Sequence, residues 1–384
     1  MDQAAKDLQQ GPYRLPREPL TRLEPGLPSA WYHNASHYRR ELDAIWYRAW
    51  VCVGREEEVA SPRDYMVAAI GTQSVVVLRH GDGGLRAFHN ACRHRGSVLC
   101  TEDRGRLKSE RIACPYHAWT YDLDGRLVAT PRQMETPGFD KARYPLHGVA
   151  VDTWGGFVFV NLLGESAPPL APALADIPAQ FERHGFEGLR VGKRIVVDVK
   201  ANWKLLLENF YECFHCPVVH PEFCEIVRAY RTAGAWGLEG VAGPEYANGA
   251  RTLTLDGTSR LPPFPGLNEE DRATLYTAQT FPPNLLLNVH PDYVNTQMLF
   301  PTGSESVRIV YDWLFESERL PMDTADLDHY VALWDLTNRQ DARNCESQQR
   351  GMHSQAFRHG HYAPQEFDCH RFAQWVRRAL GEPV

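Results

Sequence analysis

The chain has 384 residues, of which 43% are hydrophobic and 23% charged, a composition typical of globular proteins and not of disordered, collagen-like or coiled-coil chains. Its formal net charge of −7 gives no electrostatic reason to expect nucleic acid or an anionic membrane as a partner. No run approaches the roughly 18 apolar residues of a membrane helix, and the first residues lack the apolar core of a signal peptide. We therefore expect a cytoplasmic protein with no membrane segment.

Cysteine and histidine are the informative residue types. The 9 cysteines are an odd number scattered over a long chain, which does not indicate a disulfide framework. In a reducing compartment we expect them to be core residues, metal ligands or reactive thiols. The 16 histidines exceed what composition suggests and point to metal binding.

The first part of the chain, from about residue 45 to residue 161, consists of short β-prone runs separated by Asp-Gly and Gly-Gly pairs. Such pairs between β-prone runs are typical of hairpin turns. We predict a small all-β domain here. The Pro- and Ala-rich residues 166–179 are expected to form a linker.

Longer elements follow. A strand is predicted over residues 194–199, and a helix capped by Asn202 is predicted to continue to about Cys216, where Pro217 ends it. Residues 236–270 are rich in Gly and Pro and are expected to form a loop or lid. Further predictions are strands at 285–289 and 306–315, a long helix at 327–352 and an amphipathic helix at 365–380. Without a βαβ rhythm, the fold class is α+β, with an antiparallel sheet wrapped around a helix.

Two cysteines and two histidines form the first candidate metal site. Cys92 and His94 lie in one predicted turn of the β domain, and Cys114 and His117 lie in another. Two thiolates and two imidazoles can hold zinc in a closed tetrahedral site. The same four residues can hold a [2Fe–2S] cluster with Cys on one iron and His on the other.

Two histidines and a carboxylate form the second candidate site. His215 and His220 lie at the end of the predicted helix, with Glu212 expected on the same helical face as His215. Two imidazoles, one carboxylate and open positions make the facial triad of mononuclear Fe(II) oxygenases. The long C-terminal helix offers three carboxylates, Asp335, Asp341 and Glu346. Only Asp341 falls on the helix's apolar stripe, where a buried carboxylate needs a partner, so it is the predicted third ligand.

The residues around both sites resemble the Rieske non-heme iron oxygenases over most of the chain. The resemblance rests on Asn90–Gly96, Cys114–Tyr121, the pattern Asn209-x-x-Glu212-x-x-His215-x4-His220, and the segment around Gln340-Asp341. Ala118 departs from the family pattern, which usually has Gly there, and the spacer between the two cluster motifs is slightly long. The resemblance implies a Rieske domain at 45–163, and a helix-grip, START-like catalytic domain made of residues 1–44 and 164–384.

The resemblance also implies a ligand set. Cys92, His94, Cys114 and His117 would hold one Rieske [2Fe–2S] cluster, and His215, His220 and Asp341 would hold one mononuclear Fe(II). Asn209 and Glu212 belong to the family's catalytic segment, in which the acid before the first His connects the two metal centres.

The implied function is that of the oxygenase (alpha) component of a multicomponent system. Electrons would come from NAD(P)H through a separate flavin-containing reductase, with or without a ferredoxin, because the chain lacks a G-x-G-x-x-G fingerprint and a plant-type ferredoxin spacing. The expected assembly is a homotrimer in which the cluster of one subunit serves the iron of its neighbour. The expected reaction is hydroxylation or N-demethylation of a small organic substrate.

Glu at position 212, where many members have Asp, resembles the branch that oxidises quaternary ammonium compounds such as glycine betaine, choline, carnitine or stachydrine. The alternative within the family is an aromatic-ring hydroxylating oxygenase. Alternatives of other classes are a Rieske electron carrier without enzymatic activity and a zinc-stabilised binding module. Tyr211, Phe214, Trp236 and Tyr293 are candidate pocket walls. The thioredoxin-like spacing Cys213-x-x-Cys216 lacks a βα context, and we expect no redox disulfide there.

Overall fold

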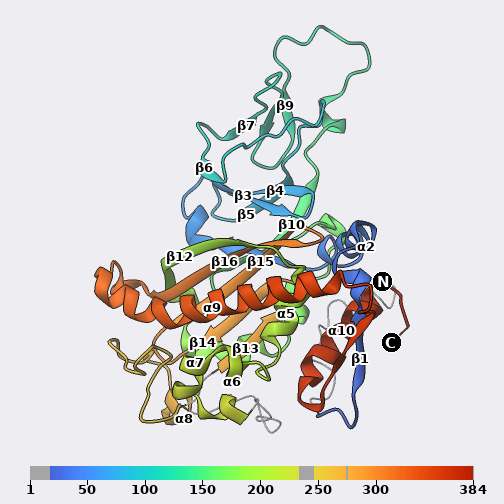
Figure 1. Ribbon diagram of the computed structural model, residues 1–384. Helices are drawn as coiled ribbons and strands as arrows, with labels where there is room; N and C mark the ends of the chain where they lie inside the picture. The colour runs from blue at the N-terminus through green and yellow to red at the C-terminus, as the bar shows by residue number, and fades with distance from the viewer. Residues whose placement is uncertain (1–17, 233–245, 274–275, 384) are drawn as a thin grey trace. The chain divides into compact units, whose positions relative to one another are not determined.

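The structure is a computed structural model that describes residues 18–232, 246–273 and 276–383. The chain divides into two compact units, Trp46–Leu170 and a second unit built from Met1–Ile45 and Ala171–Val384. The first unit is all-β and the second combines helices with an antiparallel sheet (Figure 1), so the predicted α+β class is confirmed. No helix within the described ranges is long and apolar enough to cross a membrane.

The all-β unit contains a seven-stranded sheet with strand order β2-β11-β10-β5-β4-β3-β6 and a three-stranded sheet of order β7-β8-β9. Every pairing is antiparallel, and tight turns such as the one between Ile70 and Gln73 join neighbouring strands. The strands are β2 (Val51–Arg55), β3 (Asp64–Ile70), β4 (Gln73–Arg79), β5 (Leu85–His89), β6 (Arg104–Arg106), β7 (Arg111–Ala113), β8 (Thr120–Asp122), β9 (Leu127–Ala129), β10 (Gly148–Trp154) and β11 (Phe157–Asn161).

The second unit is built on a five-stranded antiparallel sheet of order β12-β16-β15-β14-β13, and the long helix α9 lies across it (Figure 1). A two-stranded sheet, β1-β17, joins the two ends of the chain. The strands are β1 (Glu24–Pro28), β12 (Leu189–Val199), β13 (Tyr276–Phe281), β14 (Leu285–Val289), β15 (Val294–Gly303), β16 (Ser306–Glu316) and β17 (His359–Tyr362). The helices are α2 (Ala35–Glu41), α3 (Leu170–Leu174), α4 (Ile177–Phe181), α5 (Trp203–Phe210), α6 (Cys216–Val219), α7 (Pro221–Ile226), α8 (Glu269–Ala273), α9 (Thr324–Met352) and α10 (Phe367–Ala379).

Helix α5 begins as predicted and ends earlier than predicted. The Asn202 side chain accepts a hydrogen bond from the backbone N–H of Lys204, which caps the first turn. The helix stops at Phe210 and not near Cys216, so the prediction that Glu212 and His215 share a helical face was wrong. Beyond the end of α5, the Glu212 carboxylate accepts the backbone N–H groups of Phe214 and His215. A side chain that satisfies nearby N–H groups stabilises a turn in place of a further helical turn.

Buried polar contacts fix α5 in the second unit. Lys204 is fully buried and forms an ion pair with Glu41 of α2. One turn later, the Glu208 carboxylate accepts hydrogen bonds from the hydroxyls of Tyr32 and Tyr362, each at 2.7 Å. Buried charges and polar groups are stable only when they are paired in this way, so α5 is held in one orientation.

Two predicted loops contain more structure than expected. Residues 166–179 are not an extended linker, because α3 and most of α4 form there and bury Leu170, Leu174 and Ile177. In the predicted loop at 236–270, residues 236–245 lie outside the described residues. The described part has little regular structure, yet it buries Leu253, Phe264 and two threonines, Thr252 and Thr254.

Candidate functional sites

The four cluster-motif residues lie on two similar loops of the all-β unit. In the first loop, Cys92 N–H donates to the carbonyl of Ser97, and Gly96 N–H donates back to the carbonyl of Cys92. The second loop repeats this pattern, with Cys114 N–H donating to Trp119 and Ala118 N–H donating to Cys114. Each loop thus starts with a cysteine whose backbone is fixed by two hydrogen bonds.

The two loops bring their histidines together. The rings of His94 and His117 have centroids 4.7 Å apart, and His94 stacks on Trp119 at 4.9 Å. Both cysteines are buried, whereas both histidines are exposed. The four donors therefore fit a Rieske cluster, which the two buried thiolates and the two exposed imidazoles would hold.

The surroundings act differently on the cysteine and the histidine ligands. Burial raises the pKa of the Cys92 thiol, while a contact of 3.3 Å between its sulfur and the Tyr121 hydroxyl opposes that rise. Partial desolvation by its neighbours and then the nearby His117 lower the pKa of His94, which keeps its imidazole neutral and free to bind metal. The aromatic and aliphatic core around both cysteines includes Val76, Leu78, Leu127 and Leu146.

The second site gathers His215, His220 and Asp341 in the mixed α/β unit. The metal-binding atoms of these three side chains all lie within 4.8 Å of one another. Asp341 Oδ1 is 2.8 Å from His220 Nε2 and 3.5 Å from His215 Nε2. His215 precedes α6, His220 lies between α6 and α7, and Asp341 lies on α9. Three ligands on one side with open positions opposite is the donor set of a mononuclear Fe(II) centre.

The other ring nitrogen of each histidine also has a partner. His215 Nδ1 lies 2.5 Å from Glu212 Oε1, and His220 Nδ1 lies 2.8 Å from Gln340 Oε1. Such contacts fix the orientation and the tautomer of a metal-binding imidazole. Asn209 Nδ2 is 3.4 Å from His215 Nε2. Gln340 was noted in the sequence together with Asp341, but its contact with His220 was not predicted.

The charges of this site favour a bound cation. Burial lowers the pKa of His215, but its contacts with Asp341 and Glu212 outweigh burial and raise that pKa to about 10. Burial raises the pKa of Asp341, but its contacts with the two histidines lower it overall. The same negative potential that stabilises a proton on His215 would stabilise a divalent metal ion.

The two other carboxylates considered on α9 have partners elsewhere. Asp335 forms an ion pair with Arg339 at 2.8 Å, and Glu346 accepts the backbone N–H of Lys200 at 3.1 Å. Asp341 is thus the one of the three that the fold brings to both histidines.

Aromatic side chains continue from the iron site into the unit. The ring centroid of Phe223 in α7 lies 6.5 Å from that of His220. It also lies 4.8 Å from the ring centroid of Tyr230 and 5.8 Å from that of Trp334. The ring centroids of Trp334 and His290 are 5.9 Å apart. His290 packs on Tyr293 at 4.4 Å. We call Phe223, Tyr230, His290, Tyr293 and Trp334 the aromatic cluster.

The predicted pocket walls had mixed outcomes. Tyr293 belongs to the aromatic cluster, whereas Tyr211 packs on Phe372 of α10 and its hydroxyl contacts that of Thr280. Phe214 is 47% exposed and therefore lines no enclosed pocket. Trp236 lies outside the described residues.

One cysteine prediction was wrong. Cys213 and Cys216 form a disulfide, although the missing βα context argued against one. The bond closes the four-residue turn that carries His215. The turn itself brings the two Cα atoms to 4.9 Å, a separation that a disulfide can span without any βα motif.

With both sites described, comparison with known families gives the class of the protein. The family "Ring hydroxylating alpha subunit (catalytic domain)" matches residues 186–382, and the family "Rieske [2Fe-2S] domain" matches residues 49–140. The chain belongs to the Rieske oxygenases, as an alpha (oxygenase) subunit. Members of this family carry a Rieske cluster and a mononuclear iron, and they receive electrons from a partner reductase.

Several characterised relatives are similar over most of their length. The carnitine monooxygenase oxygenase subunit of Acinetobacter pittii is 30% identical over 340 residues, covering 86% of each chain. The glycine betaine monooxygenase oxygenase subunit of Pseudomonas aeruginosa is 28% identical, covering 92% of this chain and 89% of the relative. The chloroplastic choline monooxygenase of Beta vulgaris is 29% identical, covering 92% of this chain and 76% of the relative.

Solved structures agree with this family. The quaternary ammonium Rieske monooxygenase CntA superposes with a TM-score of 0.72 at 25% identity, covering 92% of this chain and 96% of that one. Naphthalene 1,2-dioxygenase from Rhodococcus superposes with a TM-score of 0.73 at 20% identity and shows the shared fold.

Proposed function

We propose that this chain is the oxygenase component of a system that oxidises a small quaternary ammonium compound. The observation that carries the proposal is the convergence of His215, His220 and Asp341, with Glu212 on the outer nitrogen of His215. The relatives named for glycine betaine, carnitine and choline support the substrate class. The aromatic cluster beside His220 supports it too, because aromatic faces attract cations that carry no hydrogen-bond donors.

We assign the cluster to Cys92, His94, Cys114 and His117, and the mononuclear iron to His215, His220 and Asp341. A cluster bound there would supply single electrons, and an iron bound by the second set would supply O₂ activation. Around the iron, the Glu212 carboxylate and the Gln340 carbonyl accept the outer N–H groups of the two histidines and hold both rings in place.

Hydroxylation of an N-methyl carbon consumes O₂, two electrons and two protons and gives a carbinolamine and water. The carbinolamine then breaks its C–N bond and releases formaldehyde, so the net reaction is a demethylation. We further propose that the electrons come from NAD(P)H through a separate flavin-containing reductase. In a homotrimer, the cluster of one subunit would serve the iron of the next, with Glu212 connecting the two centres.

The test is substrate-dependent turnover with a surrogate reductase. Purified protein, reductase and NADH are mixed with glycine betaine, carnitine, choline or stachydrine, and separately with aromatic acids. NADH oxidation, O₂ uptake and formaldehyde should rise together with one or more of the quaternary compounds. Stimulation by aromatic acids alone would contradict the proposed substrate class and favour the ring-hydroxylating alternative.

A further inference from the structure

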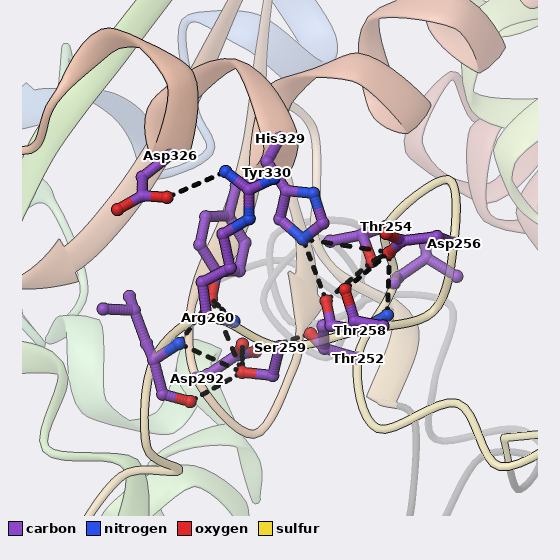
Figure 2. A network of polar contacts seen from close by, with 12 residues as sticks. Thr252, Thr254, Asp256, Thr258, Ser259, Arg260, Asp292, Asp326, His329 and Tyr330 are labelled. Carbon is purple, nitrogen blue, oxygen red and sulfur yellow. Dashed lines mark hydrogen bonds and ion pairs between the residues drawn. The ribbon is translucent and has the colours of Figure 1, made fainter.

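Asp292 is a buried carboxylate that the iron chemistry above does not use. It lies between β14 and β15 and is only 3% exposed. The hydroxyls of Thr252 and Ser259 donate to its two oxygens, each at 2.5 Å, as Figure 2 shows. Among the described residues, no Lys, Arg or His side chain forms an ion pair with it. A buried charge without a counter-charge is costly, so its presence needs an explanation.

The aromatic cluster begins at the residue next to Asp292. The ring of Tyr293 packs on that of His290, and the ring of His290 packs on that of Trp334. The ring of Trp334 packs on that of Phe223, which contacts the ring of the iron-site residue His220. Consecutive ring contacts, with centroids 4.4 to 6.5 Å apart, therefore run from Tyr293, the sequence neighbour of Asp292, to the iron site.

The charge of Asp292 acts on part of this cluster and its surroundings. Burial lowers the pKa of His290 to about 3, so its ring is neutral, and its Nε2 accepts a hydrogen bond from Trp334 Nε1. Burial and then the charge of Asp292 raise the pKa of Tyr293 well above its ordinary value. Tyr246, whose hydroxyl contacts His290 Nδ1, is affected in the same way. Asp292 thus acts electrostatically on two tyrosines that contact His290, whereas burial alone lowers the pKa of His290 itself.

We propose that Asp292 is a specificity-determining residue: its carboxylate is the fixed counter-charge that makes the aromatic cluster prefer a cationic headgroup over a neutral group of the same shape. The proposal rests on the proposed function. A quaternary ammonium suits this environment because it needs no hydrogen-bond acceptor, and the hydroxyls of Thr252 and Ser259 already occupy the carboxylate oxygens. Its attraction to Asp292 acts through space across the rings.

A cavity of about 530 Å³ borders Asp292 on the side lined by Ser259, Pro262 and Pro263. Arg251, Glu269 and Arg272 line the same cavity, but all three are exposed, so water screens their charges. The charge of Asp292 is screened much less, because the carboxylate itself is buried.

The experiment compares the binding of a cation with that of its uncharged copy. Calorimetry on the holoprotein measures Kd for glycine betaine, carnitine, choline and tetramethylammonium. It also measures Kd for the analogue of each compound with carbon in place of the quaternary nitrogen, such as tert-butylacetic acid for glycine betaine. The variants are Asp292→Asn and, as the matched control, Asp256→Asn. Asp256 lies in the same hydroxyl-rich network (Figure 2), where it contacts Thr254 and Thr258.

Asp292→Asn should weaken the binding of the charged ligand about tenfold and change the binding of the carbon analogue by less than about twofold. Asp256→Asn should change neither. Equal weakening of both ligands would show a packing role and overturn the proposal, as would unchanged affinity for the cation. If the unmodified protein binds none of the four cations, the proposed function fails, and the proposal for Asp292 fails with it. Binding that is insensitive to Asp292 would leave the proposed function standing.

Discussion

Some side-chain contacts of the iron site can be predicted from the sequence, and others cannot. The spacing of His215 and His220 and the apolar stripe around Asp341 are visible in the sequence, and the fold brings these three side chains within 4.8 Å. The contact between His220 and Gln340 joins two segments 120 positions apart, and neither residue has a pattern that requires the other. Partners of that kind depend on how α7 and α9 pack, so they follow from the tertiary structure alone.

Asp292 illustrates the cost of a buried charge, and this cost can be measured. Burial outweighs the hydrogen bonds from Ser259 and Thr252 and raises its pKa from 3.8 to about 6. Because the folded state favours the protonated form, ionisation of Asp292 destabilises the fold as the pH rises from about 4 to above 6.

We therefore predict that Asp292→Asn is stabilised relative to the unmodified protein as the pH increases. Between pH 5 and pH 8 the difference in unfolding free energy should shift by about 1 kcal/mol in favour of the variant. Urea denaturation at the two pH values measures it. A hydrogen bond lost in the variant changes the unfolding free energy equally at pH 5 and pH 8. The change in the difference between these two pH values therefore reports on the charge of Asp292 alone. A difference that does not depend on pH would show that Asp292 does not carry a buried charge.

At the scale of elements, the boundaries of helices are where sequence reasoning was least accurate. The N-cap at Asn202 was predicted correctly because its signal is local. The end of α5 was misplaced because Glu212 forms hydrogen bonds with the N–H groups of its own turn, and Pro217 was read as the terminator. Helices α3 and α4 were missed, although Leu170, Leu174, Ile177 and Phe181 follow a 3–4 spacing, because Pro and Ala dominated the interpretation.

The two cluster loops provide a prediction about backbone conformation. Gly96 has φ of +74°, and Ala118, at the matching place in the second loop, has φ of +57°. A residue with a Cβ is strained when its backbone has a positive φ of this size, whereas Gly is not.

Ala118→Gly should therefore stabilise the protein by a few tenths to about 1 kcal/mol, and Gly96→Ala should destabilise it by about 1 kcal/mol. Thermal unfolding of the holoprotein measures both. No atom lies within 4 Å of a Cβ placed on Gly96, so a loss there reports on the backbone and not on a clash. A destabilised Ala118→Gly variant would contradict the account of the second loop.

The turn that follows α5 is where Glu212 is proposed to act. Glu212→Gln keeps the shape of the side chain but removes its charge and one acceptor. Both metals should still bind, and an external reductant should still reduce the cluster. Electron transfer to the mononuclear iron should fall by orders of magnitude, since the proposed link from His215 to a cluster histidine of the neighbouring subunit loses its carboxylate.

A single-turnover experiment tests this prediction. Pre-reduced Glu212→Gln protein is mixed with O₂ and substrate, and cluster reoxidation is followed together with product. Rates and yields equal to those of the unmodified protein would show that Glu212 does not connect the centres. Loss of the mononuclear iron would show instead that Glu212 is needed to build the site.

At the scale of the whole molecule, the fold class and the family were readable from the sequence. The turn-rich β section, the change in character near residue 165 and the two ligand patterns were enough to predict an all-β unit and an antiparallel sheet with a long helix. Properties that depend on long-range packing were not readable. The aromatic cluster draws its members from α7, the residues after it, the β14–β15 connection and α9, and only Tyr293 was singled out from the sequence.

The central claim is that the chain holds two separate iron centres in two separate ligand sets, and iron content together with visible absorption tests it most directly. Purified protein should be brown, with about three irons per chain. Asp341→Ala should keep the cluster spectrum with about two irons, Cys92→Ala should lose the spectrum, and the control Asp335→Ala should change neither. A colourless protein with stoichiometric zinc would contradict the account. The account would also be contradicted if Asp335→Ala lost the mononuclear iron and Asp341→Ala retained it.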